Sequence, residues 1–343
     1  MERFLTRDNT HLSRLTIEVA EGLDTAPSDG LTSLIEGQSC AINCMSELPD
    51  DVVGLVEKSI SDNTRRAYRA DLAHFEAWGG QLPADPGAVA SYLAAHAETL
   101  SVATLVRRMA TISKAHEARG LPNPCRSEIV RATLRGVKRT RGIAQREAKP
   151  LLKEDLFRVL DAIGDGVKGA RDRALLLIGF AGGFRRSELV GLDCADIEHV
   201  RQGVVITLRR SKTDQEGAGR RIGIPYGRTR HCPVVALDNW LSISGVEIGP
   251  VFRPVDRHRR DGPERLSGEA VSLIVKERVA AAGIDASGFS GHSLRAGFAT
   301  SATQAGVSSL KIRAQTGHAS DAMLARYVRE GEMFAGNAAG ALL

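Results

Sequence analysis

Several features that would indicate common classes of protein are missing from this 343-residue sequence. No apolar run approaches the roughly 20 residues that a helix needs to cross a bilayer. Residues 1–14 alternate charged and apolar positions, without the apolar core of a secretion signal. The five cysteines are an odd number at irregular spacing, which indicates neither a disulfide framework nor a common zinc site. These absences predict a cytoplasmic protein with unpaired thiols and no membrane partner.

Signatures of nucleotide and metal chemistry are missing as well. The sequence contains no Gly-x-x-x-x-Gly-Lys-Ser/Thr loop, which cradles the phosphates of a bound nucleotide in many ATPases. It also has no carboxylate cluster that would suggest a magnesium site. A function that depends on ATP hydrolysis or on a bound metal ion therefore has no support in the residues.

The net charge of +5 is unevenly distributed. Residues 1–50 carry three basic and nine acidic side chains, whereas residues 51–150 carry 16 basic and 10 acidic ones. The stretch 131–149 is strongly basic, with seven basic residues against Glu147 alone. Basic domains attract polyanions such as DNA, although a run of this kind is also typical of a solvated surface.

Hydrophobic periodicity predicts a small helical bundle behind a flexible acidic leader at residues 1–50. The bundle occupies residues 51–140, and a basic linker follows at 141–150. Its four expected helices begin near Asp62 or Asn63, at Pro86, after Ser101 and near Ser127. The fourth is expected to turn these side chains inward: Ile129, Val130, Leu134 and Val137.

Residues 151–328 are predicted to form a second domain that is mainly helical with one small antiparallel sheet. The β-branched runs at 203–208 and 221–225 flank a polar stretch that contains glycine, which is typical of a hairpin. Helices are expected at 155–163, 174–181, 234–243, 267–282, 293–305, 308–316 and 320–328. The remaining residues, 329–343, form a short apolar tail. The fold class is therefore mainly α.

Six polar residues lie in or beside apolar segments of this second domain. In chain order they are Arg185 (in Gly-Phe-Arg-Arg-Ser-Glu-Leu), the hairpin Lys212, His292 and Arg295 (in Gly-His-Ser-Leu-Arg), His318 (in Gly-His) and Tyr327. Taken one at a time, each has an ordinary structural explanation, as a helix cap, a solvated lysine, a packing histidine or a core tyrosine. The order and spacing of the six residues must therefore decide whether they form a functional site or serve only these structural roles.

In type, order and spacing these residues resemble the tyrosine recombinase (lambda-integrase) family, which includes Cre-like and Xer-like site-specific recombinases. The motifs span residues 170–330, and the architecture is similar over 52–150. The resemblance implies an N-terminal helical, core-binding DNA-binding domain and a catalytic domain. It further implies a recombinase that cuts and rejoins DNA through a 3′-phosphotyrosyl intermediate. With the absences described above, it implies no cofactor, neither ATP nor metal.

Phosphodiester cleavage without a metal needs cations that neutralise the charge on the non-bridging oxygens, and arginine suits this best. Arg185 and Arg295 are the expected pair, and His318 is expected to donate a further hydrogen bond to the same oxygens. Tyr327 is the expected nucleophile. A phenol is mostly protonated at neutral pH, so it needs a proton acceptor, for which His292 is the candidate.

The remaining roles follow from the resemblance. Lys212 is placed to protonate the departing 5′-hydroxyl. Glu188 resembles the acidic residue that orients an arginine or a histidine of the site, with a surface or capping glutamate as the alternative.

Double-stranded DNA with specific recombination sites is the implied partner, bound by a homotetramer that assembles from monomers or weak oligomers. The tail is a candidate for docking on a neighbouring protomer, and packing within its own chain is the alternative. The candidate DNA-binding residues are Arg65, Arg66, Arg69, Arg107, Arg108, Arg135, Lys138, Arg139 and Arg141.

Three other classes of protein compete with this interpretation. A type IB topoisomerase shares the chemistry but relaxes supercoils as a monomer. A non-catalytic DNA-binding regulator would be expected to have lost part of the residue set, which is complete here. A metal-dependent nuclease would require magnesium and leave no covalent adduct.

Overall fold

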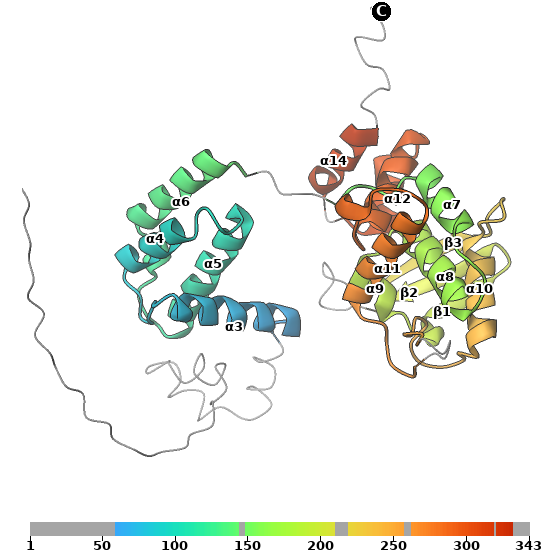
Figure 1. Cartoon of the computed structure of the whole chain (residues 1–343), viewed down its shortest axis with the longest axis horizontal. Coiled ribbons are helices and arrows are strands. Elements are labelled where there is room, and N and C mark those ends of the chain that lie inside the picture. The colour runs from blue at the N-terminus through green and yellow to red at the C-terminus, as the bar shows by residue number, and fades with distance from the viewer. Residues whose placement is uncertain (1–58, 144–147, 210–218, 257–261, 319, 332–343) are drawn as a thin grey trace, which may run out of the picture. The chain divides into compact units, whose positions relative to one another are not determined.

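The computed structural model describes residues 59–143, 148–209, 219–256, 262–318 and 320–331. The chain divides into two compact units, residues 1–145 and 146–343, each of which is described by itself (Figure 1). The acidic leader, Lys212 and most of the tail lie outside the described residues. Within the described ranges, no helix is both long and apolar enough to cross a membrane.

Over residues 59–143, the first unit is a bundle of four helices, as the periodicity predicts. They are α3 (Asp62–Ala77), α4 (Pro86–Ala95), α5 (Val102–Ala118) and α6 (Glu128–Arg141). Ser101 accepts from the backbone N–H of Thr104 and so caps α5 as expected. The cap of α3 is Ser61, one residue before the expected Asp62 or Asn63, because its hydroxyl accepts from the Thr64 N–H.

The prediction that Ile129 of α6 faces the interior of the bundle is wrong. Val130, Leu134 and Val137 are buried, whereas Ile129 is 55% exposed. The three buried residues fall at i, i+4 and i+7, which form one stripe along a helix, and Ile129 lies about 100° around the helix from Val130.

The second unit confirms the mainly α class with one small antiparallel sheet. Its helices are α7 (Lys153–Asp161), α8 (Val167–Ala181), α9 (Arg186–Gly191), α10 (Pro233–Ser244), α11 (Gly268–Ala281), α12 (Ser293–Gln304), α13 (Ser309–Thr316) and α14 (Asp321–Gly331). The sheet has the order β1 (Ile197–Val200), β2 (Gly203–Leu208), β3 (Arg220–Pro225). Strand β1 is absent from the sequence prediction, because its four residues are half-buried or exposed and show no apolar alternation.

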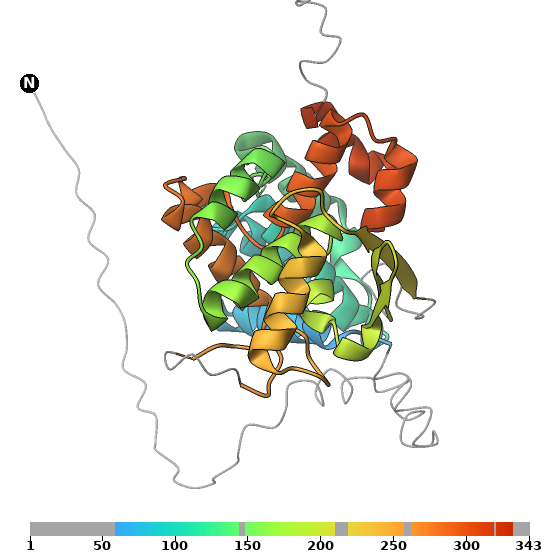
Figure 2. The same cartoon turned by 90° about the vertical axis from the view of Figure 1, so that its right-hand side faces the viewer.

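Helix α8 forms the centre of this unit and packs against α10, its neighbour in Figure 2, and against α12. Its residues Ala174 to Gly179 are all buried. Helix α12 also approaches the chain at Leu151 closely. Its Gly297 faces the Leu151 carbonyl, and a Cβ at this position would overlap that oxygen. This close packing fixes the helix that carries His292 at its N-terminus and Arg295 in its first turn.

A buried ion cluster joins α8 to α11. The Asp172 side chain is fully buried, and it accepts from Arg171 Nε at 2.8 Å and from Arg278 Nη2 at 2.6 Å. Removing one partner of a buried ion pair leaves uncompensated charge in the interior, which costs far more than losing a surface pair.

We therefore expect Asp172→Ala to destabilise the second unit by about 3–5 kcal/mol. Unfolding by urea should be followed by the fluorescence of buried Trp240 in a Trp78→Phe background, because these are the only two tryptophans. The control is Glu277→Ala, which removes the half-exposed pair with Lys168 and should cost about 1 kcal/mol or less. Equal losses in the free energy of unfolding for the two variants would contradict the stabilising role of the buried Asp172 cluster.

Candidate active site

Arg185 is held by the carboxylate of Glu188 at the start of α9. The Arg185 backbone N–H donates to Glu188 Oε2 at 2.9 Å, and its Nη1 donates to Oε1 at 2.6 Å. The Glu188 side chain is only 1% exposed. The surface alternative for Glu188 is therefore wrong, and its carboxylate both caps α9 and orients the Arg185 guanidinium.

Arg295 is buried deeper, at 1% exposure. Its Nη1 donates to the backbone carbonyls of Gly183 and Thr316. Arg185 Nη2 donates to the next carbonyl, that of Gly317, at 3.3 Å. The C-terminal turn of α13 thus binds both guanidinium groups, and the negative end of the helix dipole favours them there.

The burial of Arg295 has an electrostatic consequence. Loss of hydration, and then the nearby charge of Arg185, lower the pKa of Arg295 to about 10. The group therefore stays charged at neutral pH. Its Nη2 is buried, and no described atom accepts a hydrogen bond from it. This leaves one strong donor available for an anion.

Tyr327 lies in α14, which packs against α12 and α13. Its hydroxyl is 2.8 Å from His292 Nε2 and 3.4 Å from Arg326 Nη2, which donates to it. Partial loss of hydration, followed by the charges of Arg295, Arg326 and Arg185, lowers the pKa of His292 below 6.5. A neutral His292 can accept the phenolic proton, because Arg326 donates to the same oxygen and leaves its hydrogen free to point at Nε2.

His318 is buried behind the tyrosine ring, with the two ring centroids 5.7 Å apart. Its Nδ1 is 2.7 Å from Thr316 Oγ1, and that hydroxyl donates its single hydrogen to the carbonyl of Ile312. The hydroxyl must therefore accept from His318 Nδ1–H. In the neutral ring this leaves Nε2 without a proton.

Burial, followed by the charges of Arg295 and Arg185, lowers the pKa of His318 to about 3. The neutral ring therefore predominates before substrate binds. The expected donation from His318 to a phosphate requires the ring to gain a proton first, which the negative charge of the phosphate would favour.

The structure thus brings together five of the six predicted catalytic residues: Arg185, His292, Arg295, His318 and Tyr327. Lys212 lies outside the described residues. Two further residues of the site, Thr316 and Arg220, are absent from the sequence predictions. The only signals for them are their places, two residues before His318 and just after the hairpin stretch that contains Lys212.

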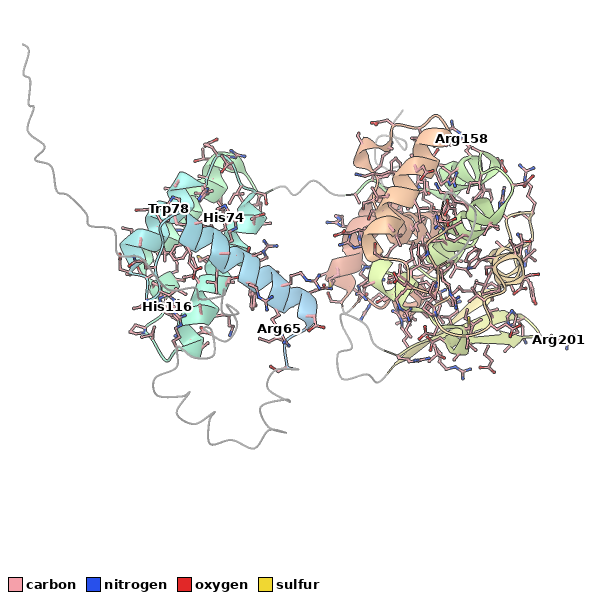
Figure 3. All side chains as sticks on the ribbon, turned by 60° about the horizontal axis from the view of Figure 1, so that its bottom comes forward. Arg65, His74, Trp78, His116, Arg158 and Arg201 are labelled. Atoms are coloured by element: carbon pink, nitrogen blue, oxygen red, sulfur yellow. The ribbon has the colours of Figure 1, made fainter. Side chains whose placement is uncertain are left out.

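The predicted DNA-binding residues of the first unit differ in their surroundings. Arg107 makes two hydrogen bonds to Asp71, at 2.7 and 2.9 Å. Arg108 is 11% exposed and donates to Tyr92 and to His74, the second of which is labelled in Figure 3. Arg108 is therefore part of the interior of the bundle.

The other candidates are more accessible. Arg65 lies near the N-terminal end of α3 (Figure 3). Arg135 and Arg141 form ion pairs with Glu128 at 2.5 Å and Glu98 at 2.7 Å. The remaining exposed or half-exposed members are Arg66, Arg69, Lys138 and Arg139. Contact of these residues with DNA stays a prediction.

The sequence predicts no metal site and unpaired thiols. Across the described ranges, no three His, Cys, Asp or Glu side chains gather in a way that could hold a metal ion. Metal independence nonetheless stays a prediction. The three described cysteines, Cys125, Cys194 and Cys232, are free thiols as expected.

A tyrosine set against a histidine beside two arginines, one of them fully buried, on a helical domain with one small sheet, is the arrangement expected of a tyrosine recombinase. The phage integrase family model matches residues 149–332, and the model of the phage integrase N-terminal SAM-like domain matches residues 55–118. The chain belongs to the phage integrase family.

Known relatives agree with this assignment. An integrase/recombinase XerD homolog from Selenomonas ruminantium is 41% identical over 82% of this chain and 86% of its own length. Recombinase Cre from Escherichia phage P1 is 28% identical over 72% of this chain and 77% of its own. A lambda integrase tetramer bound to a Holliday junction shares the fold, with a TM-score of 0.57 at 18% identity, over 79% of this chain and 73% of that one.

The Thr316 hydroxyl should set the tautomer of His318. We expect wild-type His318 to carry its proton on Nδ1, and Thr316→Val to shift the tautomer ratio toward Nε2–H by about fivefold, the equivalent of one hydrogen bond of about 1 kcal/mol. Nitrogen-15 NMR of the imidazole ring distinguishes the two forms. Thr316→Ser keeps the hydroxyl and should resemble wild type. Unchanged nitrogen chemical shifts of the His318 ring in Thr316→Val would contradict the assigned role of the Thr316 hydroxyl.

Proposed function

We propose that this tyrosine recombinase performs site-specific DNA recombination with Tyr327 as the nucleophile. The observation that carries the proposal is the 2.8 Å contact between the Tyr327 hydroxyl and His292 Nε2, in the same chain and beside Arg185 and Arg295. These two guanidinium groups are fixed before substrate binds, so little reorganisation is needed as charge grows on the phosphate.

The reaction divides into two transesterifications. His292 takes the phenolic proton as the Tyr327 oxygen attacks phosphorus, and the bond to the 5′-oxygen breaks. Lys212 protonates that oxygen, which leaves a 3′-phosphotyrosyl linkage and a free 5′-hydroxyl. A 5′-hydroxyl of the same or of a partner duplex then attacks the linkage and gives its proton back to Lys212, while the bond from phosphorus to the Tyr327 oxygen breaks and His292 returns its proton to that oxygen. Each ester formed replaces one that breaks, so no ATP is consumed.

Strand exchange between two duplexes requires several such sites at once. We propose that the chain acts as a homotetramer on paired DNA sites in the cytoplasm and is a monomer or weak oligomer when free. The lambda integrase tetramer on a Holliday junction, which shares the fold, supports this assembly. Docking of the tail at 329–343 on a neighbouring protomer is part of the same proposal.

Covalent capture tests the nucleophile and identifies the DNA site that it attacks in one experiment. Sheared genomic DNA from the source organism is incubated with protein and denatured in detergent, and protein-linked DNA is recovered and sequenced. Wild type should enrich fragments that share one sequence, whereas Tyr327→Phe should recover only background, because it lacks the attacking oxygen.

Tyr327→Phe should bind the recovered site as tightly as wild type, because many phosphate contacts are independent of the phenol. Absence of covalent DNA with wild type would indicate a non-catalytic regulator. DNA cleavage that requires a metal ion and leaves no covalent adduct would indicate a nuclease. Relaxation of supercoiled DNA without strand exchange between two sites would indicate a topoisomerase.

The lowered pKa of His292 predicts the acid limit of cleavage. His292 must be neutral to accept the phenolic proton, so the rate should be retained as the pH falls through 6.5 and decline only below it. The measurement is the rate of adduct formation on nicked suicide duplexes of the recovered site, at sub-saturating protein. His292→Gln should form the adduct slowly, and its rate should not show this decline at acid pH. A midpoint above 6.5 in wild type would contradict the assignment.

A further inference from the structure

A third guanidinium group lies beside the two predicted ones. Arg220 opens strand β3, and its side chain is 22% exposed. Its Nη1 packs against Gly317, where a Cβ would overlap it. Gly317 ends α13 in the left-handed region, with φ at 68°, and its carbonyl accepts from Arg185. The residue that terminates α13 thus also makes room for Arg220 within the site.

The Arg220 guanidinium is incompletely bonded. Its Nη2 is buried, and none of the described atoms accepts a hydrogen bond from it, which is also true of Arg295 Nη2. The nearest carboxylate oxygen, Glu188 Oε2, is 3.7 Å away, which is beyond hydrogen-bond range. Both oxygens of Glu188 already accept from Arg185. Orienting Glu188 therefore does not account for Arg220.

The charge around this group is unbalanced. In the described part of the chain, Glu188 is the one carboxylate within 4 Å of the Arg185 and Arg220 guanidinium groups, and Arg295 makes no ion pair there. Arg220 is close enough to contribute to the lowered pKa values of Arg295 and His318. Its own pKa is lowered, first by burial, with Arg185 adding to the effect. Excess buried charge is costly unless an anion with matching acceptors occupies the site.

We propose that Arg220 is a third guanidinium ligand of the scissile phosphate, donating through Nη2 to a non-bridging oxygen beside Arg185 and Arg295. The inference rests on the proposed function, because it assigns the anion as the phosphate that Tyr327 attacks. Three donors on two oxygens would neutralise more of the growing charge than a pair can.

The test compares Arg220→Gln with a matched neighbour, Arg221→Gln. Arg221 pairs with Glu198 at 2.6 Å on the exposed face of the sheet, where both side chains are more than 60% exposed. Suicide duplexes of the captured site carry either a normal phosphate or an uncharged methylphosphonate at the scissile position. The readout is the ratio of wild-type to variant rates of adduct formation on each duplex.

On the phosphate duplex we expect Arg220→Gln to be slower by about 10²–10³-fold, the usual effect of removing one donor to developing charge. On the methylphosphonate duplex the deficit should fall below about tenfold, because the charge to be neutralised is smaller. Arg221→Gln should stay within about threefold of wild type on both. A deficit equal on the two duplexes, or cleavage of the phosphate duplex at the wild-type rate, overturns the proposal.

A second readout is independent of DNA cleavage. Inorganic phosphate is titrated into the full chain while the His318 ring signals are followed by NMR. Wild type should show saturable binding, weakened at least fivefold in Arg220→Gln and unchanged in Arg221→Gln. Phosphate binding of equal affinity in wild type and in Arg220→Gln contradicts the inference. Arg220-dependent phosphate binding without covalent adduct in wild type would instead support the anion site and overturn the proposed reaction.

Discussion

The site depends on how two guanidinium groups are held in place while their positive charge is only partly neutralised. Arg295 and Arg185 donate to the carbonyls of Thr316 and Gly317 at the end of α13, and Glu188 orients Arg185 from the other side. Backbone carbonyls fix geometry while carrying no net charge, so the pocket keeps most of its positive potential. Among the described residues, one buried carboxylate, that of Glu188, orients Arg185, and the remaining positive charge forms a binding site for an anion.

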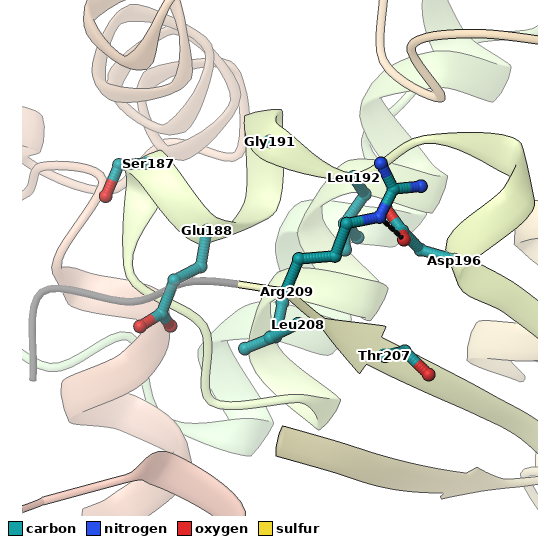
Figure 4. Close-up of a pocket in the computed structure, with 8 residues that line it drawn as sticks. All are labelled: Ser187, Glu188, Gly191, Leu192, Asp196, Thr207, Leu208 and Arg209. Atoms are coloured by element: carbon teal, nitrogen blue, oxygen red, sulfur yellow. Dashed lines mark ion pairs between the residues drawn. The ribbon is translucent and has the colours of Figure 1, made fainter. Parts of the chain in front are cut away.

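The remaining residues of the site follow from this electrostatic arrangement. Burial, with the positive charge of the pocket adding to it, lowers the pKa values of His292 and His318, so both rings are neutral before substrate binds. One neutral ring can then accept the proton of Tyr327, and the other is fixed by Thr316 with its free nitrogen unprotonated. Figure 4 shows that Glu188 points away from the Arg209–Asp196 ion pair in the adjacent pocket, which leaves its carboxylate to the site arginines.

Much of the fold could be predicted from the sequence because its signals are local. Ser101 and Pro86 mark helix starts, and the β-branched runs at 203–208 and 221–225 mark two strands of the sheet. Motif order also located Arg185, Arg295 and Tyr327. What escaped prediction depends on contacts between distant segments. The place of Arg220 depends on Gly317, and the tautomer of His318 depends on the bond from Thr316 to Ile312. Neither contact leaves a periodic pattern in the chain.

The proposed reaction depends on a covalent bond between the Tyr327 oxygen and DNA. The most direct measurement is mass spectrometry of the trapped adduct after digestion with trypsin and nuclease. Cleavage after Arg326 and Arg329 isolates the peptide Tyr327-Val328-Arg329. We expect this peptide to carry a nucleotide linked through its 3′-phosphate to the phenol. A nucleotide on any other peptide, or one linked to the phenol through a 5′-phosphate, would contradict the proposed linkage.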